Sequence, residues 1–494
     1  MSLREKAISG AKWSAASMIS IVSVQFLQVA ILAHLLKPGE LGLASMVSLV
    51  TTLADMFLDM GLSTAIVQRK NVAANELTSL YWLNVMFGAV LGGLLLAGSG
   101  VAAWFFSEPE LKTLVALAAL MFFVSPHGLL YQSLMARELM FDMLSKIEVA
   151  SSMVLFITTL VAALRGFGAY SPVIGALTAA VCRVTLLNLN GRKLHKPGLR
   201  FRLSETRSYL SFGVFQAMDS MVNYLNGNFG GIVAGRVLGA ATLGGYNLAL
   251  NCAVNFPARL NPFFTRVLFP VFSIIQDDTA KLRQNYYKLT GFIAMFNFPL
   301  VFGLMVVAPD FVVCMFGEKW LWATPVLRVL CLVGAFRCLG NPVASLMMAT
   351  ANIRVSFWFN LIKTTVMLPA IILGASLGGA LGVAISLVTV EAITIMPMYH
   401  FMLKRVLGPS LAEFFNACFV PLRMTLPMVA SVLVASELLD ASSTGHVLRL
   451  IAEVTLGAAV FGVTFLLDRS LLCAEIRGIV LKMVRKAALR HGLQ

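Results

Sequence analysis

The chain has 494 residues, of which 59% are hydrophobic and only 12% are charged, and its mean hydropathy is +0.84. Soluble globular proteins carry about 25% charged residues, so this composition excludes a soluble enzyme or a soluble binding domain. The net charge of +15 would suit nucleic acid, but the basic residues are distributed among many loops and form no basic-aromatic surface. We therefore predict a membrane protein that binds no nucleic acid.

The apolar segments have the length of membrane-spanning helices. A spanning helix needs about 20 mostly apolar residues, and only helices and closed barrels satisfy the backbone in lipid. Barrel strands alternate in hydrophobicity over about ten residues, whereas these segments are longer and continuously apolar. The first of them is also too long for the core of a signal peptide, so we expect it to be retained. The sequence predicts an all-α polytopic membrane protein with fourteen spans, at about 11–36, 41–67, 77–103, 112–134, 145–165, 171–190, 208–235, 243–270, 287–309, 322–349, 355–375, 380–403, 414–437 and 446–467.

Basic residues are divided unevenly between the two sets of loops. The N-terminus, every second loop and the C-terminal tail contain 25 Lys and Arg residues, whereas the opposite loops and their margins contain six. Cytoplasmic loops of membrane proteins are enriched in Lys and Arg. The division predicts that both termini are cytoplasmic, which agrees with an even number of spans.

The longest loop, 191–207, is the expected linker between two six-helix lobes. Its basic run is typical of contact with the anionic lipids of the inner leaflet. On this division, residues 1–190 form the N-lobe, 208–403 the C-lobe and 414–467 two further helices. The tail, 468–494, has the spacing of an amphipathic helix lying on the membrane surface.

A weak internal repeat supports two related halves. The turn after the first span reads ILAHLLKPGELG (Ile31–Gly42), and the turn after the seventh reads IVAGRVLGAATLG (Ile232–Gly244). Both begin with two apolar residues and Ala, and both end in Leu-Gly. Many transporters are built from such repeats and bind substrate between the halves. We therefore expect two equivalent hairpins to face one cavity.

Candidate chemistry outside the membrane is sparse. The loops between the predicted spans are too short to hold a soluble catalytic domain. The seven cysteines and six histidines are scattered, with no CxxC pair and no Cys/His cluster. We therefore predict no catalytic residue, no metal site, no cofactor and no enzymatic activity.

Polar residues occur within apolar segments, above all between 208 and 272. Four of them follow at intervals of four and so share one helix face: Asn247, Asn251, Asn255 and Arg259. Amide side chains both donate and accept hydrogen bonds, which suits sugar hydroxyls, although hydrogen bonds between helices are the alternative. The residues predicted to contact sugar are Asn223, Asn247, Asn251, Asn255, Gln25 and Gln28.

Three basic residues lie deep in the predicted spans, namely Arg259, Arg337 and Lys363. Ionisable groups inside a membrane are costly and indicate function by default. A water-filled cavity lined by Arg and Lys would attract an anion, and the guanidinium fork matches phosphate oxygens. We therefore predict that these residues bind substrate anion, with internal ion pairing as the alternative.

Four acidic residues at membrane depth are candidates for coupling to an H⁺ or Na⁺ gradient, because coupling requires a group exposed differently in two states. Asp55 and Asp59 lie one turn apart, where two carboxylates can share a proton. Asp219 and Arg259 lie twenty residues on either side of Gly239. An antiparallel hairpin with its turn at Gly239 would therefore place this acid and base at similar depth. The candidates are Asp219, Asp55, Asp59 and Glu391.

Several segments resemble one family. They are MSLREKAISGAKWSA, GGYNLALN, LNPFFTRVLFPVFSIIQDDTAKLRQNYYKL, FGEKW and GNPVASLMMA. They are similar to segments of the bacterial polysaccharide exporters of the multidrug/oligosaccharidyl-lipid/polysaccharide superfamily, over residues 1 to about 410. The resemblance implies two six-helix lobes that face each other in a V, plus two C-terminal helices, in the bacterial inner membrane.

The same resemblance implies a flippase. It would move undecaprenyl-pyrophosphate-linked repeat units of a colanic-acid-like exopolysaccharide by alternating access, beside a polysaccharide polymerase and export machinery. A multidrug/cation antiporter of the same fold is one alternative, but a cation site would be acidic or apolar, and the deep Arg and Lys residues oppose it. A non-transporting scaffold for a polysaccharide synthase is another, and it would need no polar cavity.

Overall fold

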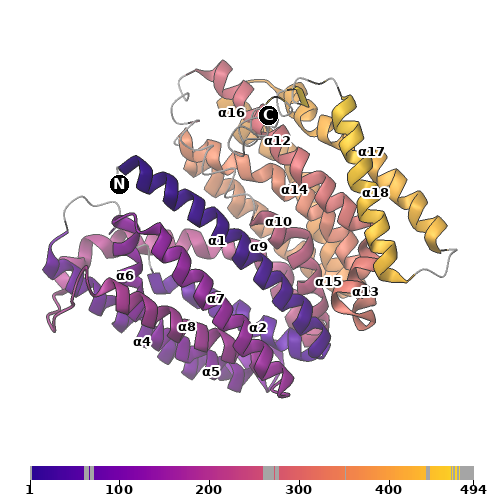
Figure 1. Ribbon diagram of the computed structural model, residues 1–494. Coiled ribbons are helices and arrows are strands. Elements are labelled where there is room, and N and C mark those ends of the chain that lie inside the picture. The colour runs from indigo at the N-terminus through magenta and orange to yellow at the C-terminus, as the bar shows by residue number, and fades with distance from the viewer. Residues whose placement is uncertain are drawn as a thin grey trace, which may run out of the picture. The chain divides into compact units, whose positions relative to one another are not determined.

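The computed structural model is helical throughout its described elements (Figure 1). It describes residues 3–59, 66, 72–259, 272, 278–350, 352–440, 445–468, 470, 473, 474 and 478. No strand occurs among these residues, so the predicted all-α fold is confirmed.

The helices follow one another in chain order with short connections. The first part of the chain forms α1 (Leu3–Leu35), α2 (Pro38–Asp59), α4 (Ala74–Phe106), α5 (Leu111–Val124), α6 (Pro126–Arg137), α7 (Phe141–Leu164), α8 (Tyr170–Gly191) and α9 (Leu203–Leu250). The second part forms the π-helical turn η1 (Asn251–Asn255), α10 (Phe256–Ala258), α12 (Thr279–Val306), α13 (Ala308–Phe316), the 3-10 turn η2 (Glu318–Ala323), α14 (Thr324–Ala349), α15 (Ile353–Met398), the π-helical turn η3 (Tyr399–Leu403), α16 (Lys404–Leu407), α17 (Leu411–Asp440) and α18 (His446–Leu467).

The number of spans agrees with the fourteen predicted. Eleven described helices are long and apolar enough to cross a membrane, and the bent pair α5–α6 makes a twelfth. Two of these twelve, Ser220–Ala258 and Arg354–Leu407, contain glycines with non-helical backbone. Each is therefore two spans joined by a tight turn, and twelve plus two gives fourteen.

Glycine makes both tight turns. Gly239 has φ +82° and Gly379 has φ +57°, which are left-handed conformations that glycine adopts without a steric penalty. The turn predicted near Gly239 is confirmed. The span predicted at 112–134 differs from expectation, because it is bent by 47° between α5 and α6. Pro126 begins α6, and proline lacks the N–H that would continue the helix from α5.

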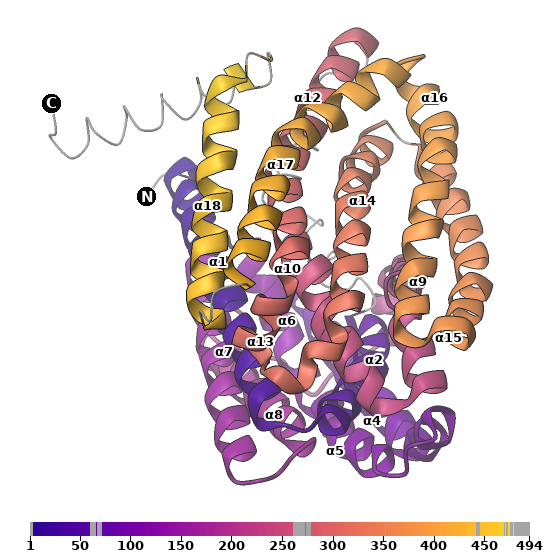
Figure 2. The ribbon, with the colours of Figure 1, turned by 90° about the vertical axis from the view of Figure 1, so that its right-hand side faces the viewer.

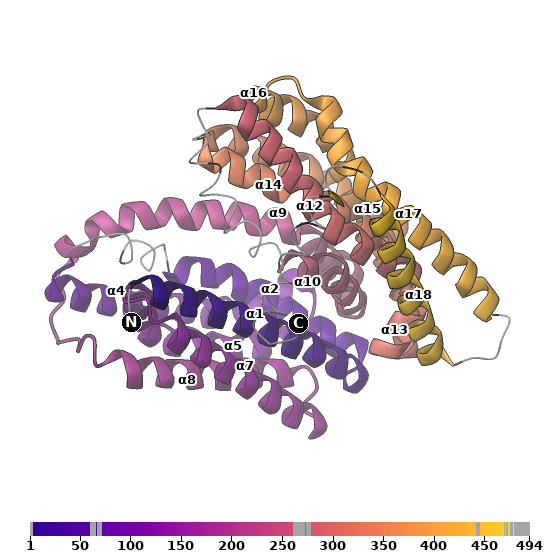
Figure 3. The same ribbon diagram turned by 45° about the horizontal axis from the view of Figure 1, so that its top comes forward.

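The described chain forms two compact units. Unit 1 contains Met1–Leu248 and Ile371–Val383, and unit 2 contains Ala249–Ala370 and Ala384–Gln494. In unit 1, α7 packs between α1 and α8, and α4 packs on α5 (Figure 3). In unit 2, α12 packs on α14 and α17, and α17 packs on α18 (Figure 2). The linker at 191–207 lies within unit 1, and the predicted division into lobes stays a prediction.

The two Leu-Gly turns of the sequence repeat touch each other within unit 1. A Cβ atom on Gly42 would lie 1.7 Å from the carbonyl oxygen of Ala240, and one on Gly244 would lie 2.7 Å from the carbonyl oxygen of Pro38. Backbone atoms cannot rotate away as side chains do, so a methyl group at either position requires the helices to move apart. The shared glycine therefore lets each turn approach the other.

Carboxylates complete the starts of the helices at this contact. Glu40 Oε2 accepts a hydrogen bond from the Lys37 backbone N–H at 2.8 Å, and Glu108 Oε1 accepts one from the Ala240 backbone N–H at 3.3 Å. The first N–H groups of a helix have no partner within the helix, so both bonds satisfy donors that lipid would leave unpaired. Glu108 belongs to the turn between α4 and α5, which ties α9 to that pair of helices.

Substituting Gly42 with Ala tests the close contact between the turns. We expect Gly42→Ala to destabilise the protein by about 2 kcal/mol or more, because the added methyl group overlaps the Ala240 carbonyl. The measurement is the thermal midpoint of the purified protein in detergent. Gly39→Ala in the same helix is the matched control, since no atom lies within 4 Å of its Cβ position. Equal midpoints for the two variants would contradict the contact.

Candidate functional site

A buried carboxylate lies between two cations in unit 2. Glu391 Oε1 accepts a hydrogen bond from Arg337 Nε at 3.2 Å, and Glu391 Oε2 accepts one from Lys363 Nζ at 2.6 Å. The Glu391 side chain is 8% exposed, against 25% for Arg337 and 15% for Lys363. Two positive charges and one negative charge leave this ion triad with a net charge of +1.

The turn at Gly378 and Gly379 brings two members of the triad together. Lys363 precedes the turn and Glu391 follows it within α15, whereas Arg337 comes from α14. Small residues let the two arms of α15 approach, since a Cβ on Gly382 would lie 1.9 Å from the Gly374 carbonyl oxygen. The triad is therefore fixed by one glycine turn and one helix contact.

The triad combines a structural role with spare donor capacity. A buried charge without a partner is strongly destabilising, so Glu391 stabilises both cations in the membrane. Arg337 pairs through Nε, which leaves its two terminal amino groups as donors in a partly exposed position. An Arg side chain with free terminal amino groups can bind phosphate oxygens through charge-assisted hydrogen bonds. An anion that binds these donors therefore competes with Glu391 for the charge of Arg337.

Arg259, the third predicted anion ligand, has a different environment. Its exposed guanidinium lies 5.6 Å from the centre of the Phe256 ring, in a cation–π contact. The preceding Asn stripe passes through the π-helical turn η1, where Asn255 Nδ2 donates to Asn251 Oδ1 at 2.9 Å. Pro257 follows this turn and lacks an N–H, which is a common cause of a local change in helical hydrogen bonding.

The remaining candidates are distributed over unit 1. Gln28 Nε2 donates to Thr159 Oγ1 at 3.5 Å, and Gln25 Oε1 is buried without a hydrogen-bond partner among the described residues. Asn247 is half-buried, whereas Asn223 and Asp55 are exposed. The side chains of Asp59 and Asp219 lie outside the described part of the structure. The predicted pairing of Asp219 with Arg259 therefore stays a prediction.

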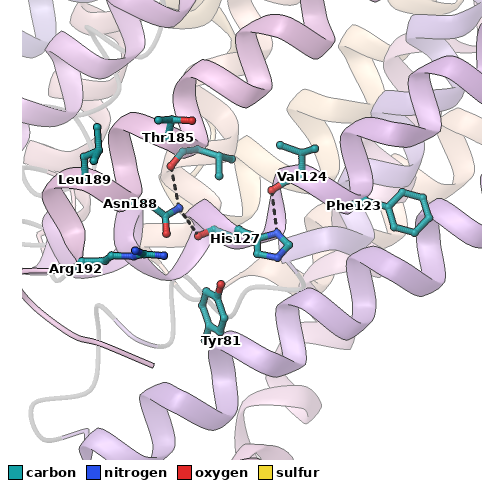
Figure 4. A pocket seen from close by; sticks show the side chains of 9 residues that line it. Tyr81, Phe123, Val124, His127, Thr185, Asn188, Leu189 and Arg192 are labelled. Carbon is teal, nitrogen blue, oxygen red and sulfur yellow. Dashed lines mark hydrogen bonds between the residues drawn. The ribbon is translucent and has the colours of Figure 1, made fainter. Parts of the chain in front are cut away.

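Two groups of polar residues were not identified from the sequence. Asp310 is 3% exposed, and its carboxylate lies 2.6 Å from His446 Nδ1 and 3.5 Å from an Arg449 amino group, which links α13 to α18. A pocket of about 480 Å³ lies between α4, α5, α6 and α8 (Figure 4). In the sequence, Arg449 and Arg192 count only among the basic residues in loops and their margins. That count does not reveal their partners.

Comparison with known proteins identifies the family. The family model described as polysaccharide biosynthesis protein matches residues 31–325. The chain belongs to this polysaccharide biosynthesis protein family. The lipopolysaccharide biosynthesis protein WzxC of Escherichia coli (strain K12) is 42% identical over 86% of this chain and 87% of its own length. The teichuronic acid biosynthesis protein TuaB of Bacillus subtilis (strain 168) is 32% identical over 93% and 95%.

A membrane protein from the cps region of Klebsiella pneumoniae is 38% identical over 99% of this chain and 100% of its own length.

Solved structures show which fold this chain shares. The lipid II flippase MurJ, in an inward closed conformation, is similar with a TM-score of 0.72 over 92% of this chain and 98% of that one, at 14% identity. An inward-facing MATE family multidrug transporter of the MOP superfamily gives a TM-score of 0.60 over 78% and 98%, also at 14% identity. The predicted MATE-like fold is confirmed.

Removing the shared carboxylate tests the ion triad. We expect Glu391→Gln to destabilise the protein by about 3 kcal/mol, because both cations lose their buried counter-ion. The double variant Lys363→Gln/Glu391→Gln returns the site to a net charge of +1 and should recover much of that loss. The thermal midpoints of the wild type, both single variants and the double variant form a double-mutant cycle. Additive effects of the two substitutions would exclude the pairing.

Proposed function

We propose that the chain carries a polyprenyl-pyrophosphate-linked polysaccharide repeat unit across the bacterial inner membrane. Kinship with polysaccharide biosynthesis proteins over nearly the whole chain supports the glycan. The observation that carries the proposal is the ion triad, because its net positive charge matches a phosphate-bearing cargo. The lipid tail of the cargo stays in the bilayer, whereas its charged and sugar groups pass through the protein.

The cargo's phosphates compete with Glu391 for the same cations. In the state without cargo, Glu391 pairs with both Arg337 and Lys363. A bound pyrophosphate takes its place beside Arg337, and the amides of Asn251 and Asn255 in the same unit contact the glycan. A ligand shifts a conformational equilibrium only through different affinities for the two states. The exchange of counter-ion supplies this difference and gives Glu391 its predicted role in coupling.

Arg259 is the second cation in this proposal. It lies at the end of α10, next to the Asn251–Asn255 pair, so one short segment offers a charge for phosphate and amides for sugar. Its guanidinium lies over the Phe256 ring, and such a contact leaves N–H groups of the guanidinium as donors for an anion. A cytoplasmic position of both termini and contact with a polymerase belong to the same proposal.

The two alternatives make different demands on the triad. A drug/cation antiporter shares the fold, as the MATE structures do, but a net positive site repels a cationic drug. A scaffold without transport has no use for a partly exposed Arg with free donor groups. Catalysis is not part of the proposal, since transport requires binding and conformational change alone.

Loss of the Arg337 charge is the direct test of this function. We expect Arg337→Gln to lower flipping of a pyrophosphate-linked oligosaccharide about tenfold, the value of one charge-assisted hydrogen bond. Flipping is measured in proteoliposomes as the fraction of glycan that becomes accessible to a membrane-impermeant lectin. Arg328→Gln is the matched control, because Arg328 is an exposed cation on the same helix outside the triad.

Three further results define the outcome. Arg337→Lys should recover part of the activity, since it restores charge but not the planar fork. Equal flipping by Arg337→Gln and Arg328→Gln, at equal folded protein, would exclude the triad as the anion site. Absence of flipping by the wild type itself, with unchanged exopolysaccharide synthesis in cells, would favour the scaffold.

Asp55 tests the predicted coupling to an ion gradient. We expect Asp55→Asn to keep exchange of cargo between equal compartments but to lose acceleration by an imposed H⁺ or Na⁺ gradient, because the substituted side chain no longer changes charge. The measurement compares flipping rates with and without the gradient. Asp142→Asn, which alters an exposed carboxylate in the first turn of α7, should retain the acceleration. An unchanged gradient dependence in Asp55→Asn assigns coupling elsewhere.

A further inference from the structure

The pocket between α4, α5, α6 and α8 has two kinds of wall (Figure 4). One wall is apolar and faces outward: Leu189 is 66% exposed and Phe123 is 37% exposed. The other is polar, with Arg192, Tyr81 and His127 pointing toward one another across the cavity. A cavity that joins an exposed apolar helix face to a cation fits an amphipathic ligand.

We propose that this pocket binds an anionic glycerophospholipid of the phosphatidylglycerol type from the surrounding bilayer. Arg192 supplies the charge for the phosphate, in the geometry that guanidinium groups use for phosphate oxygens. The exposed apolar surface of α5 and α8 receives the acyl chains. The site belongs to unit 1 alone and is independent of the transported cargo.

Asn188 adds selectivity for a hydroxyl-bearing headgroup. Its side-chain nitrogen donates to two backbone carbonyl oxygens, those of His127 at 3.1 Å and Val184 at 2.9 Å. Carbonyl groups only accept hydrogen bonds, so this orientation of the amide is determined and both of its N–H groups are used. The amide oxygen of Asn188 is therefore the acceptor that lines the pocket, and it matches the glycerol hydroxyl of the headgroup.

The connection between α8 and α9, residues 192–202, forms a basic strap beside the pocket. Three hydrogen bonds hold it across the start of α4: Thr78 Oγ1 lies 3.1 Å from His195 Nε2, the Arg202 backbone N–H donates to Ser79 Oγ at 3.2 Å, and Trp82 Nε1 donates to the Gly198 carbonyl at 2.8 Å. Arg192 is the first residue of this strap. The strap thus places a fixed cation at the mouth of the pocket.

The composition of the strap fits a membrane surface better than water. Leu199 is 96% exposed and precedes Arg200, and Leu194 is 40% exposed and follows Lys193. Apolar side chains that alternate with cations enter the headgroup region, where the cations meet lipid phosphates. A water-soluble sugar phosphate would leave these side chains and the apolar wall in water, so the bilayer is the better source of the ligand. The exposed cations of the strap are Arg192, Lys193, Lys196, Arg200 and Arg202.

Quenching of Trp82 by brominated lipid tests the proposal on the full-length protein in detergent. Trp82 neighbours the pocket residue Tyr81, with 5.5 Å between ring centres. The fluorescence of Trp82 is obtained as the difference between the wild type and Trp82→Phe. We expect brominated phosphatidylglycerol to quench at about tenfold lower concentration than brominated phosphatidylcholine, the value of one charge-assisted contact. Arg192→Gln should bring the two lipids to within about twofold.

Control variants separate the pocket from general surface charge. Arg165→Gln removes an exposed cation from the turn before α8, at the opposite end of that helix, and should keep the tenfold preference. Thr185→Phe fills the mouth of the pocket at an exposed position and should abolish quenching by either lipid at low concentration, even if Arg192→Gln fails to fold.

Two results would overturn the proposal. An equal preference for phosphatidylglycerol in the wild type, Arg192→Gln and Thr185→Phe would show that the lipid binds elsewhere. Competition by glycerol phosphate at concentrations similar to those of the lipid would show a site for a soluble phosphate compound, with no role for the acyl chains.

Discussion

Glu391 is the residue on which the charge balance of unit 2 depends. Its carboxylate satisfies Arg337 and Lys363 at once, and a membrane interior tolerates these cations only with such a partner. Because one negative charge serves two positive ones, the cluster is stable yet still attracts an anion. The same geometry therefore explains how the fold accepts deep cations and why they retain a use in binding.

The triad in turn depends on glycine turns. Lys363 and Glu391 are neighbours only because Gly379 adopts a left-handed conformation that reverses the chain. Gly239 likewise reverses the chain within α9. The contact of Gly42 with Ala240 shows how closely the turns of unit 1 can pack. Glycine thus acts here at two levels, in the backbone conformation of the turns and in the distance between helices.

The sequence alone predicted the features that follow from hydrophobicity and charge. Fourteen spans, the turn at Gly239 and the position of Arg337, Lys363 and Glu391 within apolar segments could be read from it, because lipid imposes length and polarity on each segment. Partners could not be predicted, since they depend on which way each helix faces. The bend at Pro126 and the π-helical turn before Pro257 also required coordinates, because proline alone does not determine how a helix adjusts.

The two phosphate-binding regions proposed for this chain differ in what surrounds the cation. Arg337 is partly buried and paired with an acid, so a phosphate can bind there only by competing with that acid, and the competition changes the internal ion pairs. Arg192 is exposed on a strap that also carries the exposed side chains of Leu194 and Leu199. Since Arg192 has no buried carboxylate beside it among the described residues, a phosphate can bind there without displacing a counter-ion. A cargo site must distinguish two states, whereas a lipid site need only hold the protein at the membrane surface. The presence or absence of a buried carboxylate beside the cation is the physical feature that separates these two uses of the same chemistry.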